Sequence, residues 1–176
     1  MAPKMERTNL DPLYKVFNEF DVVQNAVIGA HALYEFVGYY SRKDTAQKGV
    51  RLSHCFAVLP IVFTDEYTKE IYNRNFSRGS FIKVLTSDNI IFQGVQKRME
   101  DLAPTTLMSF NIAFSSNLLL YDNETSRVHL GKGINIKSRN GSGKGYDEII
   151  KASMRLGSWF AQVDEEQLLA FLNIKF

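Results

Sequence analysis

Residues 149–163, IIKASMRLGSWFAQV, constrain the fold more than any other part of the sequence. Apolar residues recur there at helical spacing, so we expect a helix with one broad apolar face in the core. Gly157 lies inside this helix, where glycine costs about 1 kcal/mol relative to alanine, and close approach of another backbone is the usual compensation. Trp159 is the only tryptophan, and we expect it to anchor other elements against the helix.

The length and composition are those of an ordinary globular domain. The chain has 176 residues, of which 45% are hydrophobic and 23% charged, and its formal net charge is +2. Neither wholesale disorder nor a globally charged binding protein is indicated. The one cysteine, Cys55, excludes an intramolecular disulfide and a cysteine-rich zinc site. Without a bilayer-length apolar run or an apolar signal core, we expect a single cytoplasmic domain over residues 1–176, with no membrane partner.

The first half of the chain is expected to be helical. Helical periodicity predicts a first helix over residues 21–40. Residues 52–63, LSHCFAVLPIVF, are almost wholly apolar, and Pro60 disfavours a continuous helix through them. We therefore expect a helical turn that ends by Val58 and then an extended crossing over residues 61–63.

The middle of the chain has the order of a winged helix. One helix is expected to start near residue 87 and to end at Pro104, and a second to run over about residues 105–117. Two β-prone runs, residues 118–121 and 127–130, flank a turn-rich tetrapeptide and predict a hairpin. The expected fold class is therefore α+β and mainly α-helical: a compact helical domain with a winged-helix-like helix–helix–β-hairpin segment.

Two regions outside the main elements are candidates for contacts. Residues 1–17 are predicted to be a flexible or docking arm, in which Leu13, Val16 and Phe17 are able to order on a partner. Residues 131–145 form a Gly-, Ser- and Lys-rich loop. Basic residues gather in and beside this loop, with no Asp or Glu among them: Arg127, Lys132, Lys137, Arg139 and Lys144. Such a cluster contacts a phosphate backbone or an acidic protein patch, and a solvated loop explains it equally well.

The sequence shows no catalytic constellation. Residues 140–145, NGSGKG, lack the Ser or Thr that follows the lysine of a phosphate-binding loop, and Ser138 stands where its first glycine belongs. His54 and Cys55 are adjacent, whereas a nucleophile and its base normally come from separate segments, so we interpret them as a buried structural pair. No histidine spacing suits a metal. We expect no enzyme activity, no cofactor and no metal.

Three segments resemble the middle component of bacterial three-component ABC ATPase systems, including the small accessory subunit of Lamassu-type antiphage defence. They are VVQNAVIGAHALYEFVGYY at residues 22–40, FAVLPIVFTDEYTKEI at residues 56–71, and KASMRLGSWFAQVDEEQLLAFLNIKF at residues 151–176. The matching positions are Gln24, Asn25, Tyr39, Tyr40, Leu59, Pro60, Leu156, Gly157, Trp159 and Phe160.

The resemblance implies a non-catalytic adaptor. In that family the middle component accompanies an SMC-like ABC ATPase and an effector, often a nuclease, and DNA is reached through the complex. The resemblance assigns no role to residues 127–145. The residues alone leave open a stand-alone winged-helix DNA-binding regulator, which would bind duplex DNA by itself with steep salt dependence.

Overall fold

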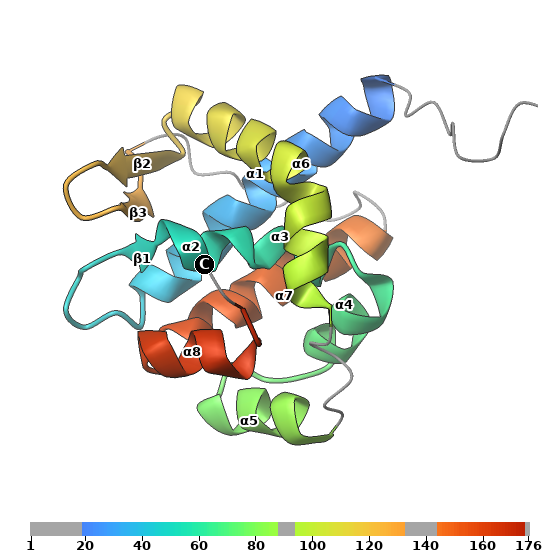
Figure 1. Cartoon of the computed structure of the whole chain (residues 1–176), viewed down its shortest axis with the longest axis vertical. Helices are drawn as coiled ribbons and strands as arrows, with labels where there is room; N and C mark the ends of the chain where they lie inside the picture. Colours follow the sequence, from blue (N-terminus) through green and yellow to red (C-terminus); the bar gives the residue numbers. More distant parts are fainter. Residues whose placement is uncertain (1–18, 88–93, 133–143, 175–176) are drawn as a thin grey trace, which may run out of the picture.

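Helices and one small sheet make up the computed structural model, which describes residues 19–87, 94–132 and 144–174 (Figure 1). The α+β, mainly helical fold class is confirmed. The helices are α1 (Glu19–Ser41), α2 (Leu52–Phe56), α3 (Val58–Val62), α4 (Asp65–Tyr72), α5 (Arg78–Ser87), α6 (Val95–Ser115), α7 (Lys144–Phe160) and α8 (Glu165–Phe171). The strands are β1 (Val50–Arg51), β2 (Leu119–Asp122) and β3 (Arg127–Leu130). None of the helices in these described ranges is long and apolar enough to cross a membrane.

The core is built around α1 and α7, which lie side by side and run in the same direction (Figure 1). Their backbones meet at Gly157, where a methyl group would lie 2.1 Å from the carbonyl oxygen of Phe36. The predicted reason for a glycine inside this helix is therefore confirmed. Phe36 also packs edge-on against Phe160, with ring centres 5.4 Å apart. This seam of α1 and α7 is the best-packed contact between elements in the described structure.

The prediction of an extended crossing after Val58 is wrong. Pro60 is the third residue of α3, and all five residues of this helix are buried. A proline is tolerated in the first turn because the N–H that it lacks would have no intrahelical acceptor there. Thr64 is the N-cap residue of the helix that follows, α4, and its hydroxyl donates to the carbonyl oxygen of Pro60 (2.8 Å).

The predicted helix end at Pro104 is also wrong. A single helix, α6, continues through Pro104 from Val95 to Ser115. Packing of α6 against α1 and α3 offsets the backbone hydrogen bond that proline removes. Within the described residues 94–130, the winged-helix-like segment is therefore one helix followed by a hairpin, without a separate recognition helix. The preceding helix, α5, lies at the bottom of the molecule in Figure 1, apart from the hairpin at the upper left.

The predicted hairpin is confirmed, and a third strand joins it. β2 and β3 pair antiparallel, with Tyr121 opposite Val128. β1 pairs with the other edge of β3, where Val50 lies opposite Val128. β1 could not be predicted from the sequence, because a strand of two residues is too short to show the alternation of a β-strand. The sheet contacts α1 through β1 and β3.

Candidate interaction surfaces

Trp159 is a core anchor, as predicted. Its side chain is completely buried, and its ring stacks on Phe81 with centres 5.5 Å apart. The indole N–H donates to the carbonyl oxygen of Asn75 at 3.0 Å. Ser158 of α7 and Gln162, just after this helix, hold the same connection, because both donate to the carbonyl oxygen of Phe76. The C-terminal half of α7 therefore fixes the connection between α4 and α5.

Most positions that carry the family resemblance belong to the core. The buried ones are Tyr40, Leu59, Pro60, Leu156, Gly157, Trp159 and Phe160. Tyr39 is half-buried and Asn25 is exposed, both on α1. Gln24 also lies in α1, with its side chain outside the described part. Burial raises the pKa of Tyr40 to about 12, so its hydroxyl stays protonated. These positions define the fold rather than a reactive site.

His54 and Cys55 form the buried pair that was predicted. Burial lowers the pKa of His54 to about 4, and the nearby Glu165 carboxylate does not offset this effect. Burial likewise raises the pKa of the Cys55 thiol far above its usual range. The thiolate is the reactive form of cysteine, so this residue is an inert part of the core. Within the described ranges, no group of three or more His, Cys, Asp or Glu residues is placed to hold a metal ion.

Arg127 is engaged inside the protein. Its two terminal nitrogens contact the two carboxylate oxygens of Glu165 at 2.7 and 3.1 Å, and one of them also donates to the carbonyl oxygen of Gly49 at 2.7 Å. Arg51 contacts the same carboxylate. Burial alone would raise the pKa of Glu165, but the hydrogen bond and charge of Arg127 outweigh it and lower the pKa. The arginine thus joins the sheet to α8.

The other predicted contact residues are not brought together by the described structure. Lys132 is exposed just after the hairpin. Lys144 begins α7, with its side chain outside the described part. Lys137 and Arg139, and the arm residues Leu13, Val16 and Phe17, lie outside the described residues. Their roles as partner contacts remain predictions.

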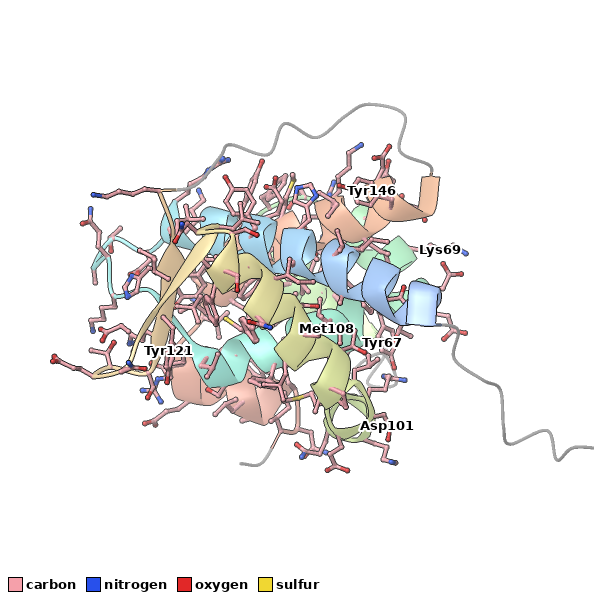
Figure 2. All side chains as sticks on the ribbon, turned by 90° about the horizontal axis from the view of Figure 1, so that it is seen from above. Tyr67, Lys69, Asp101, Met108, Tyr121 and Tyr146 are labelled. Carbon is pink, nitrogen blue, oxygen red and sulfur yellow. The ribbon has the colours of Figure 1, made fainter. Side chains whose placement is uncertain are left out.

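An apolar strip lies along the outer side of α6 and continues onto β2. We name it the α6 strip; it consists of Leu107, Met108, Phe114 and Tyr121. Leu107 is 57% exposed, Met108 40% and Tyr121 39%, which is far more than large apolar residues show in a core. Phe114 lies seven residues after Leu107, on the same side of the helix, and its ring contacts Tyr121 with centres 6.3 Å apart. Figure 2 shows Met108 beside α6 and Tyr121 at the hairpin.

A groove continues the α6 strip at the hairpin. Its volume is about 550 Å³, and Tyr121, Leu52 and Phe56 supply its apolar lining. The half-exposed Arg51 and the largely buried Arg127 also line it, together with polar residues of the hairpin turn. The ring of Phe56 in turn packs on Phe110 of α6, with centres 5.6 Å apart. The α6 strip and this groove form one apolar surface with basic residues beside it, which sequence periodicity could not reveal because it joins three elements.

Comparison with known proteins gives one family. The family model described as ABC-three component (ABC-3C) system Middle Component 3 matches residues 14–176. The match therefore includes α1, the sheet and α7, and with them every position on which the sequence resemblance was based. No curated protein and no solved structure matches the chain significantly.

Proposed function

Because the chain belongs to the family of Middle Component 3 of ABC-three component systems, we propose that it is a non-catalytic adaptor that joins the ABC ATPase of its system to an effector. The family match over residues 14–176 is the observation that carries this proposal. The finer proposal is that the ATPase is SMC-like, that the effector is a nuclease, and that the complex acts in the cytoplasm in Lamassu-type antiphage defence.

The α6 strip is the surface that we assign to the ATPase. Full burial of a leucine or methionine side chain contributes about 1.5–3 kcal/mol each. Leu107 and Met108 are both largely uncovered in the isolated chain, so they retain much of this contribution for a partner. Large apolar side chains in the centre and a polar or basic rim are typical of stable protein interfaces. The groove beside Tyr121, with Arg51 in its lining, extends the same surface.

The buried His54–Cys55 pair supports the non-catalytic part of the proposal. Neither side chain is accessible, and the Cys55 thiol stays protonated, whereas a nucleophilic cysteine is a thiolate. An adaptor needs no such site. Its contribution to the system would be the geometry in which it holds the other two subunits.

Co-purification tests the proposed function. The three subunits are expressed together with an affinity tag on the effector, with and without this chain. The proposal predicts that the effector retains the ATPase only when this chain is present. Retention of the ATPase without this chain would contradict an adaptor role. Measurable nucleotide hydrolysis by the purified chain alone would contradict the non-catalytic part.

A further inference from the structure

A row of alternating cations and aromatic rings crosses the surface formed by α1, the α4–α5 connection and α7. Arg42 lies 4.1 Å from the centre of the Tyr39 ring, and Tyr39 stacks on Phe76 with centres 5.3 Å apart. Arg155 lies 5.1 Å from the centre of the Phe76 ring. We name this surface the cation–ring row; its members are Arg42, Tyr39, Phe76, Arg155, Tyr72 and Lys151.

The second half of the row is built in the same way. Arg155 also lies 5.6 Å from the centre of the Tyr72 ring, and Lys151 lies 5.4 Å from that centre. Three cations are therefore separated and oriented by three rings. Contacts of this kind stabilise a cation at the face of a ring and limit its rotamers.

Hydrogen bonds to backbone carbonyl oxygens hold the cation–ring row in place. The Arg155 guanidinium donates to the carbonyl oxygens of Arg74 at 2.5 Å and Lys151 at 3.0 Å. The connection that carries Phe76 is fixed by the indole of Trp159 and by Ser158. A binding surface that is already ordered loses less conformational entropy when a ligand arrives.

The positive charge of the row is not neutralised by the rest of the described protein. In residues 19–87, 94–132 and 144–174, the ion pairs of carboxylates with Lys or Arg involve Lys69, Arg74, Lys97, Arg51 and Arg127, and none involves a cation of the row. Of the three acidic residues on the helix of Tyr72, Glu70 is paired with Arg74 and Asp65 with Lys69. Lys43 and Arg78 are exposed in the adjoining segments and add charge.

We propose that the cation–ring row binds the phosphate backbone of a nucleic-acid duplex without reading its sequence. A duplex presents about one charge per 1.7 Å along its axis, so a linear set of cations finds phosphates in any register. An acidic protein patch would have to match the spacing of these cations with its own carboxylates. The rings are covered on their faces by the cations and by one another, so they are not platforms for stacking the bases of a single strand. The inference does not depend on the proposed adaptor role.

The test uses the purified full chain and a fluorescently labelled duplex, DNA in one arm and RNA in the other. Binding is measured by anisotropy over a salt series. The variant Arg42→Gln/Lys151→Gln removes two exposed cations of the row and leaves the anchored Arg155 in place. The control Lys48→Gln/Lys97→Gln removes the same charge at exposed positions outside the row. Thermal melts establish that both variants are folded.

We expect the wild type and the control to bind a duplex at low salt and to lose affinity as salt rises. Each phosphate contact contributes about 0.9 to the slope of log K against log salt, so the row variant should show a slope smaller by about two. Its loss of affinity between roughly 50 and 200 mM salt should accordingly be about tenfold smaller. Comparison of the labelled DNA and the labelled RNA shows which kind of duplex the row binds.

A second variant, Phe76→Leu, keeps every charge but removes the ring between Tyr39 and Arg155. It should weaken duplex binding at low salt with an unchanged salt slope. The proposal is overturned if the wild type fails to bind either duplex, or if the row variant binds like the control. Loss of ATPase association instead of duplex binding in the row variant would assign the surface to an acidic protein and would equally overturn it.

Discussion

Helices α6 and α7 differ in what covers their apolar residues. In α7, Leu156, Trp159 and Phe160 are all buried against α1 and its neighbours. In α6, Phe110 is buried, but Leu107 and Met108 remain exposed beside it. The fold therefore accounts for the apolar face of α7 and leaves part of the apolar surface of α6 unexplained. That difference separates residues that specify the structure from residues that are available to a partner.

Each of the two helices contains one residue that disfavours a helix, and these two residues differ in the same way. Gly157 of α7 is required, because a side chain there would overlap the backbone of α1. Pro104 of α6 is only tolerated, since it is exposed and the helix around it is held by packing. Substitutions should accordingly affect stability in α7 and binding in α6. The predictions below test this division, starting with the largest expected loss of stability.

Gly157→Ala should cause the largest loss. The added methyl group would meet the carbonyl oxygen of Phe36 at 2.1 Å, and the backbone of α1 cannot move away without opening the core. We expect a destabilisation of more than about 4 kcal/mol, measured by urea denaturation. Gly145→Ala is the matched control in the same helix, because nothing lies within 4 Å of the added group there; it should be neutral or stabilising. Equal stability of the two variants would contradict the close α1–α7 contact.

Trp159→Ala should cost about 3–5 kcal/mol, since it removes the largest buried side chain and its stacking on Phe81. Trp159→Phe should cost less, because it keeps a ring and loses the hydrogen bond to Asn75, which contributes about 0.5–1.5 kcal/mol. Thermal melts of both variants provide the comparison. If Trp159→Ala melts like the wild type but no longer binds the ATPase, Trp159 is an interface residue and its assignment to the core is wrong.

The free energy of unfolding of the protein should decrease as the pH falls from about 6.5 to 4. His54 has its pKa lowered to about 4 in the folded protein, so below pH 6.5 the unfolded chain takes up the proton first. The stabilisation is fully present above the unfolded pKa, and about 3 kcal/mol of it is lost across this range. Urea denaturation at several pH values should show the loss, and His54→Gln should flatten it. A wild-type profile that is flat from pH 6.5 to 4 would refute the buried, neutral imidazole.

Leu107→Ser/Met108→Ser should have the smallest effect on stability. Leu107 is 57% exposed and Met108 40%, so the double replacement should change the free energy of unfolding by no more than about 1 kcal/mol. The same chemical denaturation assay applies. A loss comparable with that of Trp159→Ala would show that the α6 strip belongs to the core.

The sequence predicted those elements whose determinants are local. The periodicity of residues 149–163 located α7, and the tetrapeptide after residue 121 located the hairpin. Asp164 caps the last helix, because its carboxylate accepts hydrogen bonds from the backbone N–H groups of Glu166 and Gln167. Each of these signals is contained within a few residues of the chain. They sufficed for the fold class.

The features that were missed depend on contacts between distant segments. Packing on α1 and α3 decides whether α6 continues through Pro104, and local rules favoured a break. The pairing of Arg127 with Glu165 joins residues 38 positions apart, so a basic cluster in the sequence gave no sign that this charge is used internally. The cation–ring row likewise joins residues from α1, α4 and α7. Surfaces of this kind become visible only once the fold is known.

The most direct test of the central claim measures how tightly the ATPase subunit binds when the α6 strip carries charge. In Leu107→Asp/Tyr121→Asp, two exposed apolar residues become acidic, and the control Gln167→Asp/Ala170→Asp places two acidic residues at exposed positions of α8, outside the α6 strip. Each variant is immobilised through a tag, and ATPase binding is measured by surface plasmon resonance. The account predicts at least about a hundredfold loss of affinity for the strip variant, equivalent to about 2.8 kcal/mol, and little change for the control. Wild-type affinity in a folded strip variant would contradict the assignment of α6 as the docking surface.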